Sequence, residues 1–367
     1  MVEWKKLGEV CKVHTGSQLN RSDMLAFGPY PVVNGGREYS GYTDNFNEKA
    51  NSITISQGGE SAGFVNWIDV YFWAGAHCYV VEIPDYYDTR YIYHTLKNNE
   101  RVFQTSKQGA GIPGLNRETL YKQIIPIPSL QEQQRIVGIL DTFTASIDNL
   151  KEQIAQRRKQ YEYYRDQLLD LEGKPGVEMK MLGEVFDTRN GYTPSTSNEQ
   201  FWVGGTIPWF KMEDIRDNGR ILHDSYLHIT PTAVKGKGLF KANSIILATS
   251  ATIGEHALIL VDYLCNQRFT NFFPKEKYTQ SIEMKYVYYY MFIIDEWCKQ
   301  HVNQGGFASV EMSGLYNMSF PIPSLQEQQR IVSILDTFED SIQNLEAQLE
   351  QREKQYEYYR NKLLTFE

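Results

Sequence analysis

The chain has 367 residues, of which 41% are hydrophobic and 22% charged, with a formal net charge of −8 at pH 7. This length predicts two or more domains with cores of their own, and the composition excludes an intrinsically disordered protein. No run approaches the roughly 18 apolar residues that cross a membrane, and the acidic balance excludes a module that binds DNA through bulk positive charge.

The first ten residues, MVEWKKLGEV, contain no apolar stretch of the kind found in secretory signals. The four cysteines stand apart from one another and from closely spaced histidines: Cys11, Cys78, Cys265 and Cys298. This pattern favours reduced, structural cysteines in a cytoplasmic protein and gives no support to a metal site.

Residues 1–125 predict a mixed α/β domain that is nearly neutral, with 12 Lys and Arg against 13 Asp and Glu. Alternating apolar residues and glycine-rich turns indicate strands, and a 3.6-residue period indicates a helix. The expected elements are an entry strand in residues 7–16, strands at 52–56 and within 70–83, one helix over 88–105 and a short strand in 121–127.

A long helix is expected over residues 127–172, and residues 322–367 repeat it with 33 of 46 positions identical. In both copies the apolar residues recur at alternating steps of four and three, which is the heptad pattern of a coiled coil. Arg157 and Arg352 occupy the same rung near the middle of the two ladders. Each Arg either fixes the register of the pair or extends its charge out of a loose seam.

The second half repeats the plan of the first half after a linker at residues 173–180. The tetrapeptide LGEV recurs at an offset of 175 residues and the long helix at 195, so the second domain has 20 additional residues. Residues 246–255 correspond to 54–63, and Asn266, Gln267 and Arg268 fall where Ala76 and His77 fall. The ends of the two halves are nearly copies, whereas their middles differ.

The linker determines the expected arrangement of these parts. Eight residues reach at most about 28 Å, whereas a helix of 40 residues is about 60 Å long. The second domain is therefore expected at the far end of the first helix, and the second helix is expected to run back antiparallel to the first. The predicted fold class is two α/β (α+β) domains, related by a pseudo-twofold axis and separated by an antiparallel two-helix coiled coil.

Several of these segments together resemble the specificity subunit of type I restriction-modification systems over essentially the whole chain. They are the blocks IPIPSLQEQQRIV (residues 125–137) and FPIPSLQEQQRIV (320–332), the two LGEV openings, GTIPWFKMEDI (205–215) and ILATSATIGE (246–255). The resemblance implies target-recognition domains at 1–125 and 181–320, spacer helices at 126–172 and 321–367, and the linker at 173–180.

The resemblance also implies a function and partners. The chain is expected to be a non-catalytic subunit that reads a bipartite, asymmetric site in double-stranded DNA. Its helices are expected to dock two methyltransferase (M) subunits, which supply S-adenosylmethionine and the chemistry, and restriction (R) subunits can join this complex. No cofactor is expected in this chain itself.

The chemistry of the side chains in the expected turns predicts candidate DNA-binding residues. Arg and Lys suit guanine, Asn and Gln suit adenine, and Ser, Thr and Tyr suit phosphates. The alternative for each is a solvated loop residue or a turn cap. Gln267 and Arg268 rank highest, because they are adjacent and lie beside strand-like apolar runs. The candidates are Asn34, Arg37, Tyr39, Tyr42, Gln57, Ser61, Lys107 and Gln108 in the first domain, and Tyr192, Thr193, Lys211, Arg216, Thr249, Ser250, Thr252, Gln267, Arg268, Asn303 and Gln304 in the second.

The sequence also contains weaker signals for other functions. GESAG (residues 59–63) fits the G-x-S-x-G motif of esterases, but a strand-like segment follows it where that motif requires a helix. The sequence contains no phosphate-binding P-loop and no Asn-Pro-Pro-aromatic methyltransferase motif. The remaining alternatives are a coiled-coil adaptor whose two domains bind proteins, and a hydrolase that depends on Ser61.

Overall fold

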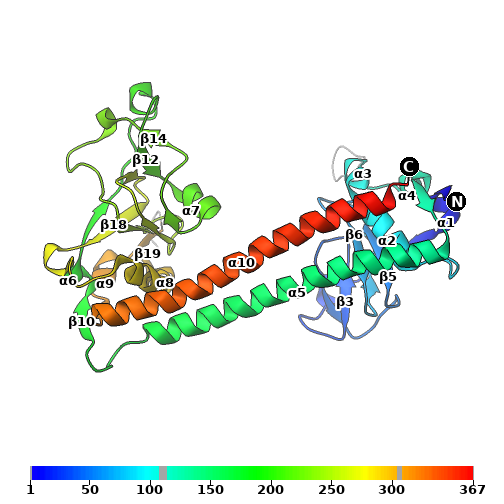
Figure 1. The fold of residues 1–367 in the computed structure, drawn as a ribbon, viewed down its shortest axis with the longest axis horizontal. Helices are drawn as coiled ribbons and strands as arrows, with labels where there is room; N and C mark the ends of the chain where they lie inside the picture. Colours follow the sequence, from blue (N-terminus) through cyan, green and yellow to red (C-terminus); the bar gives the residue numbers. More distant parts are fainter. Residues whose placement is uncertain (1, 107–113, 304–307, 367) are drawn as a thin grey trace. The chain divides into compact units, whose positions relative to one another are not determined.

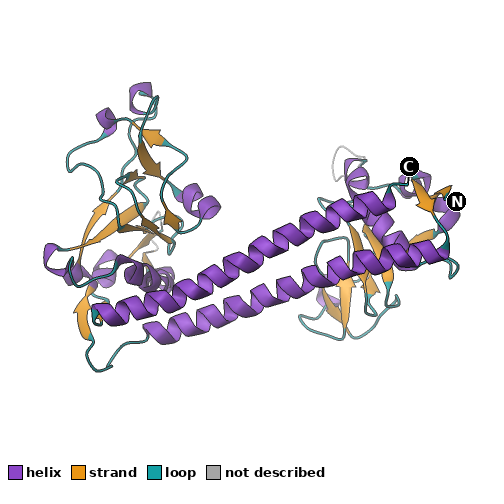
Figure 2. Cartoon of the chain, in the orientation of Figure 1, coloured by secondary structure: helices purple, strands orange, loops and turns teal. Residues whose placement is uncertain are grey.

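The structure, a computed structural model, describes residues 2–106, 114–303 and 308–366. The chain divides into two compact units, Met1–Gln153 with Leu345–Glu367 and Ile154–Asn344, and each is described by itself. Each unit holds one domain of mixed strands and helices together with one half of each long helix (Figures 1 and 2). No helix among the described residues has the length and apolar character needed to cross a membrane.

The first domain consists of two main sheets with short helices. Its sheets have the orders β2-β8-β5-β6 and β4-β3-β7, and β1 pairs with β9 separately. The elements are β1 (Glu3–Lys6), α1 (Leu7–Val10), β2 (Lys12–Thr15), β3 (Tyr30–Val33), β4 (Gly41–Thr43), β5 (Ser52–Ser56), β6 (Val65–Ile68), β7 (Trp73–Ala74), β8 (Cys78–Glu82), α2 (Thr89–Asn98), α3 (Glu100–Thr105), α4 (Arg117–Lys122) and β9 (Ile124–Ile127).

Two expectations for this domain are wrong in detail, and one short helix was not expected. The LGEV tetrapeptide forms the helical turn α1 instead of a strand, and its Glu9 side chain accepts a hydrogen bond from the Lys6 N–H (3.2 Å). The single helix expected over 88–105 is broken at Asn99 into α2 and α3. Helix α4 was not expected; Asn116 caps its first turn, and it is too short to show a helical period.

The second domain has the same plan with more elements. Its sheets have the orders β11-β18-β15-β16-β13 and β14-β12-β17, with the separate pairs β19-β20 and β10-β21. The elements are β10 (Glu178–Met181), α6 (Leu182–Val185), β11 (Phe186–Asn190), β12 (Ile207–Phe210), α7 (Met212–Asn218), β13 (Ile221–Leu222), β14 (His228–Ile229), β15 (Ser244–Ala248), β16 (His256–Ile259), β17 (Leu264–Cys265), β18 (Phe269–Pro274), α8 (Met284–Gln300), β19 (Val302–Asn303), β20 (Ser309–Val310), α9 (Met312–Tyr316) and β21 (Ser319–Ile322).

The two domains correspond strand by strand. The order β2-β8-β5-β6 matches β11-β18-β15-β16, and β4-β3-β7 matches β14-β12-β17, with one antiparallel and one parallel pair in each three-stranded sheet. The second domain has α7 and β13 between β12 and β14, where the first has only a hairpin loop. This accounts for much of the additional length predicted from the sequence.

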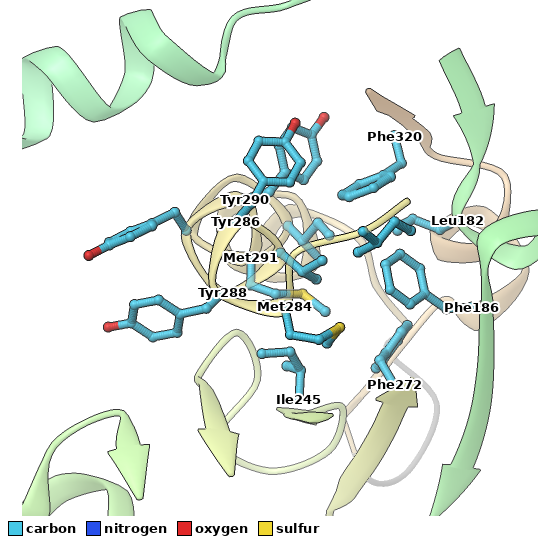
Figure 3. Packing of buried hydrophobic residues seen from close by; sticks show 14 of the residues in the cluster. Leu182, Phe186, Ile245, Phe272, Met284, Tyr286, Tyr288, Tyr290, Met291 and Phe320 are labelled. Carbon is cyan, nitrogen blue, oxygen red and sulfur yellow. The ribbon is translucent and has the colours of Figure 1, made fainter. Parts of the chain in front are cut away.

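The core of the second domain lies between helix α8 and the five-stranded sheet. Tyr286 and Met291 of α8 pack with Ile245 and Phe272 of the sheet, and Phe320 closes the cluster beside them (Figure 3). The equivalent helix of the first domain, α2, packs on the first sheet through Tyr91, Ile92 and Leu96. Burial of these large side chains stabilises each domain by about 1.5–3 kcal/mol per residue before entropy is counted.

The repeated proline and glutamine block fastens each long helix to its own domain. Tyr91 Oη donates to Pro126 O, and Tyr286 Oη donates to Pro321 O, both at 2.9 Å. The side chain of Gln133 is buried; its Nε2 donates to Pro128 O (2.9 Å) and its Oε1 accepts from Asp88 N (2.9 Å). Gln328 makes the same two contacts in the second unit. The block is therefore explained by buried hydrogen bonds that are made twice.

The long helices α5 (Leu130–Leu169) and α10 (Leu325–Leu364) pair antiparallel. In the first unit Phe143, near the start of α5, stacks on Tyr359, near the end of α10, with ring centroids 5.2 Å apart. In the second unit Phe338 and Tyr164 make the reciprocal stack at 5.5 Å. The expected antiparallel pairing is confirmed within each unit.

The ladder residues of the helices are mostly buried or half-buried, and two sets of them make contacts beyond the apolar seam. Ile136 and Leu140 of α5 belong to the core of the first domain, so the first two rungs of the ladder also anchor that domain. The guanidinium of Arg157 lies 5.8 Å from the Phe338 ring, and that of Arg352 lies 5.7 Å from the Phe143 ring. Each Arg thus extends from the seam over an aromatic ring of the opposite helix.

Candidate nucleic-acid interface

Three loops converge in each domain at the ends of matching strands. In the first domain Gln57 N, after β5, donates to His77 O (2.9 Å), and Gly75 N donates to Val33 O at the end of β3 (2.9 Å). In the second domain Thr249 N, after β15, donates to Arg268 O (3.0 Å). Asn266 N donates to Phe210 O at the end of β12 (3.0 Å). We call residues 34–37, 57–61 and 75–77 the first loop cluster, and residues 211, 249–252 and 266–268 the second loop cluster.

Beside each loop cluster, a glycine lies very close to a backbone carbonyl oxygen of a neighbouring strand. A Cβ atom on Gly16 would lie 2.1 Å from Ala74 O, and one on Gly191 would lie 2.3 Å from Cys265 O. A side chain at either position would clash with this oxygen, so only glycine fits there. The next residue then bonds to the same oxygen, through Ser17 N and Ala74 O in the first domain and Tyr192 N and Cys265 O in the second. The two loop clusters therefore share one backbone frame, as the sequence correspondence of residues 266–268 with 76–77 predicted.

The first loop cluster brings together four of the candidates. Asn34 Oδ1 accepts from His77 N (3.3 Å), so this side chain holds two loops together. Arg37 is exposed, and its guanidinium lies 5.6 Å from the Phe64 ring. Gln57 and Ser61 are half-buried in the turn that follows β5.

Of the other candidates of the first domain, Tyr39 and Tyr42 contact each other, and two lie outside the described residues. Tyr39 is 45% exposed and contacts Tyr42 of β4 edge-to-face, with ring centroids 6.3 Å apart. Lys107 and Gln108, together with Gln304 of the second domain, are outside the described residues.

The second loop cluster carries the two highest-ranked candidates on its surface. Gln267 and Arg268 are exposed, and Thr193 Oγ1 donates to Gln267 Oε1 (2.5 Å). The turn is fixed because Arg268 N donates to Asn266 Oδ1 (2.9 Å). Arg268 is thus presented by an ordered turn at the end of a strand, which suits a side chain that reads a base edge.

The candidates after β15 meet the strand pair β19-β20. Ser250 forms a bridge with Ser309, and Asn303 of β19 pairs with the same Ser309 of β20. Thr249 Oγ1 lies 2.9 Å from Thr270 Oγ1, so its hydroxyl is used inside the domain. Thr252 Oγ1 is buried with no hydrogen-bond partner among the described atoms.

Three further candidates have structural partners. Tyr192 Oη accepts from Lys235 N (2.8 Å) and donates to Ala233 O (3.0 Å), so this hydroxyl is fully used. Lys211 precedes α7, and its N–H donates to Asp214 Oδ2 (2.7 Å). Arg216 of α7 forms an ion pair with Glu255 (3.0 Å).

Ser61 has no helix behind it. The residue lies in the turn between strands β5 and β6, and Phe64 N donates to its carbonyl oxygen (2.9 Å). The strand-turn-helix context of an esterase elbow is therefore missing here. Among the described residues, no group of three or more His, Cys, Asp or Glu side chains is placed to hold a metal ion.

Several basic residues in these loops and in the connection between β14 and β15 are not among the predicted candidates. His77 was used only to align the halves, although its backbone connects Asn34 and Gln57. The tract Lys235-Gly236-Lys237-Gly238 was also overlooked; Gly236 and Gly238 have φ values of 52° and 72°. Lysines beside glycines in a turn are a recognisable signal for phosphate contacts, and this signal was present in the sequence.

Comparison with known proteins gives consistent matches. The family model described as "Type I restriction modification DNA specificity domain" matches residues 1–157 and 175–353. The EcoR124I/EcoR124II specificity subunit of Escherichia coli is 33% identical over 393 residues, covering all of this chain and 94% of that protein. The EcoprrI specificity subunit of Escherichia coli is 46% identical over 216 residues, which span 55% of this chain and about half (53%) of that subunit.

A solved structure has the same fold. The crystal structure of the type I restriction-modification S subunit from M. genitalium superposes with a TM-score of 0.63 over 100% of this chain and 97% of that chain. Its sequence identity is 19%, so this likeness concerns the fold alone.

Proposed function

Because the chain belongs to the type I restriction-modification DNA specificity family, as a specificity subunit with two target-recognition domains, we propose that its two loop clusters read the two halves of a bipartite site in double-stranded DNA. The subunit is a recognition chain and not the catalytic chain of its system.

One observation supports this proposal above the others. The two loop clusters have the same backbone hydrogen bonds but different side chains at matching positions: Asn34 and Lys211, Gln57 and Thr249, His77 and Arg268. A shared frame with different donors and acceptors is what two readers of different base pairs need. It also gives a reason for an asymmetric site.

Selection from a random pool of duplex DNA tests the proposal. We expect the chain, bound to its methyltransferase partner, to enrich two short motifs separated by an unspecified spacer. Arg268→Ala is expected to relax one motif and Gln57→Ala the other, because each bidentate contact contributes about 1–3 kcal/mol of discrimination. Lys277→Ala, which changes an exposed residue in the turn after β18, serves as the control and should leave both motifs unchanged. Enrichment of one continuous motif, or of none, would contradict the proposal.

We further propose that the helix pair docks two methyltransferase subunits, which carry S-adenosylmethionine, and that a restriction subunit can join them in the cytoplasm. The support is a repeated exposed surface. Tyr163 on α5 and Tyr358 on α10 are each 58% exposed, and the adjacent Tyr164 and Tyr359 are also exposed. Exposed tyrosines beside arginines are typical of protein interfaces, and two identical sets favour two copies of one partner.

Light scattering after co-expression with the methyltransferase measures this docking. Tyr163→Ala or Tyr358→Ala alone is expected to reduce the complex from two methyltransferase subunits to one, and the double variant to none. Glu162→Ala, the exposed neighbour of Tyr163, is the control. Two subunits retained by the double variant would rule out this surface.

A further inference from the structure

The second domain contains a cavity of about 560 Å³ on one face of its five-stranded sheet, apart from the second loop cluster. Its walls include three cations, Arg189, Lys237 and Lys241, and one acid, Asp187. The volume lies in the range of small-ligand sites, and the excess of positive charge indicates an anion.

Arg189 is a partly buried cation of this wall. Its guanidinium carbon lies 3.9 Å from the centroid of the Phe240 ring, and its Nη2 donates to Gly238 O (3.0 Å). Among the described residues it forms no ion pair, whereas Lys241 pairs with Asp262 (2.8 Å). Partial burial lowers the pKa of the Arg189 guanidinium. A partly buried charge without a counterion is unfavourable, so an anionic ligand would stabilise it.

In the first domain, the residue at the position of Arg189 is His14, and acidic side chains contact it. Arg189 lies opposite Asn271 on β18, as His14 lies opposite Val80 on β8. His14 is held by Glu48 (2.8 Å) and Glu82 (3.3 Å). The residue that corresponds to Glu82 is Phe273, and β14 and β15 are joined by the lysine-rich loop. The second domain therefore has the cation Arg189 where the first domain has a histidine held by two glutamates.

Asn271 lines this cavity with a side chain that is fixed by other residues of the domain. The residue is 1% exposed, and its Nδ2 donates to Tyr263 Oη (2.7 Å) and Ser244 Oγ (3.0 Å). Its Oδ1 is buried and has no partner among the described atoms. Phe273, which is 37% exposed, also lines the cavity. The site thus offers cations and an aromatic face.

We propose that this cavity binds the phosphate of a nucleotide unit, with Arg189 and Lys237 as its anion contacts and Phe273 against the base or sugar. A guanidinium fork with a nearby ammonium is the pair that protein sites commonly use for phosphate oxygens. The nucleotide unit is either part of the DNA backbone or a free nucleotide. The DNA case rests on the proposed function, and the free-nucleotide case does not.

Two variants and a matched control test the cavity in the full-length chain. Arg189→Met keeps the aliphatic stem over Phe240 but removes the charge. Lys237→Met changes an exposed lysine, so this variant should still fold even if Arg189→Met does not, and it keeps the proposal testable. Lys277→Met removes one positive charge elsewhere in the same domain. The first probe is ATP, whose binding is measured by thermal shift and titration calorimetry. The second probe is a nonspecific DNA duplex, whose binding is measured by fluorescence anisotropy across a salt series.

If the site binds the DNA backbone, each cavity variant weakens duplex binding by about three- to tenfold and reduces the salt slope by about 1, and the control does neither. If it binds a free nucleotide, ATP raises the melting temperature of the wild type and the control but not of the variants. Variants that match the wild type with both probes overturn the proposal. A complex with the methyltransferase that selects no bipartite motif from random duplexes, with an ATP response that depends on Arg189, would refute the proposed function while supporting the cavity.

Discussion

The His94 imidazole is fully buried and connects three elements of the first unit. Its Nε2 lies 2.8 Å from Asp141 Oδ1 on α5, and its Nδ1 lies 3.1 Å from Tyr356 Oη on α10. A carboxylate only accepts, so the neutral ring donates from Nε2 and accepts from Tyr356. Arg90 also donates to Asp141 Oδ1 (2.8 Å). This cluster fixes helix α2 against both long helices.

This burial makes the stability of the first unit depend on pH. Burial lowers the pKa of His94, although Asp141 acts in the opposite direction and Arg90 and Arg360 add to the lowering. The unfolded chain binds a proton near pH 6.5, whereas the folded chain resists it. The stability is therefore complete above that pH and falls as the pH drops toward the lowered value in the folded chain.

Thermal unfolding between pH 7.5 and 5.5 checks this expectation. The wild type should lose melting temperature on acidification, and His94→Gln should show a flatter profile from a lower starting value. His223→Gln, which replaces an exposed histidine, should follow the wild type. A His94→Gln profile as steep as that of the wild type would assign the acid sensitivity to another group, such as the buried His256.

At the scale of elements, a long periodic segment was predictable and a short one was not. The heptad ladder predicted α5 and α10, because forty residues repeat one period, and the eight-residue linker predicted their antiparallel direction. The strand expected from residue 7 begins only at Lys12, because the four residues of α1 are too few to show a helical period and lie directly before strand β2. Whether a candidate side chain is free to bind DNA also depends on its neighbours in space. The Tyr192 hydroxyl forms hydrogen bonds with residues 41 and 43 positions away in the sequence. Sequence proximity gives no sign of such partners.

The buried glutamines at the helix starts carry a prediction at this scale. Gln133→Ala removes the partners of both Asp88 N and Pro128 O, so we expect it to cost about 1–3 kcal/mol in the free energy of unfolding. Gln134→Ala, the exposed neighbour, should change that free energy by about 0.5 kcal/mol or less. Urea denaturation followed by circular dichroism measures both values. Equal costs for the two variants would show that the buried amide does not fasten the helix.

At the scale of the whole molecule, the chain repeats one plan of a domain followed by a helix. The parts that repeat closely are the scaffold: the buried glutamines, the proline carbonyls and the helix ladders. The parts that differ are the loop clusters and the cavity beside Arg189. We expect the scaffold to set the distance between the two readers and the loops to set what each one reads.

Inserting one heptad into each long helix, after Gln153 in α5 and after Gln348 at the matching point of α10, tests this division most directly. Seven helical residues add about 10 Å, or roughly three base pairs of DNA. DNA selected by the lengthened chain, in complex with its methyltransferase, should keep both short motifs and separate them by about three more base pairs. Changed motifs with an unchanged spacer would contradict the account.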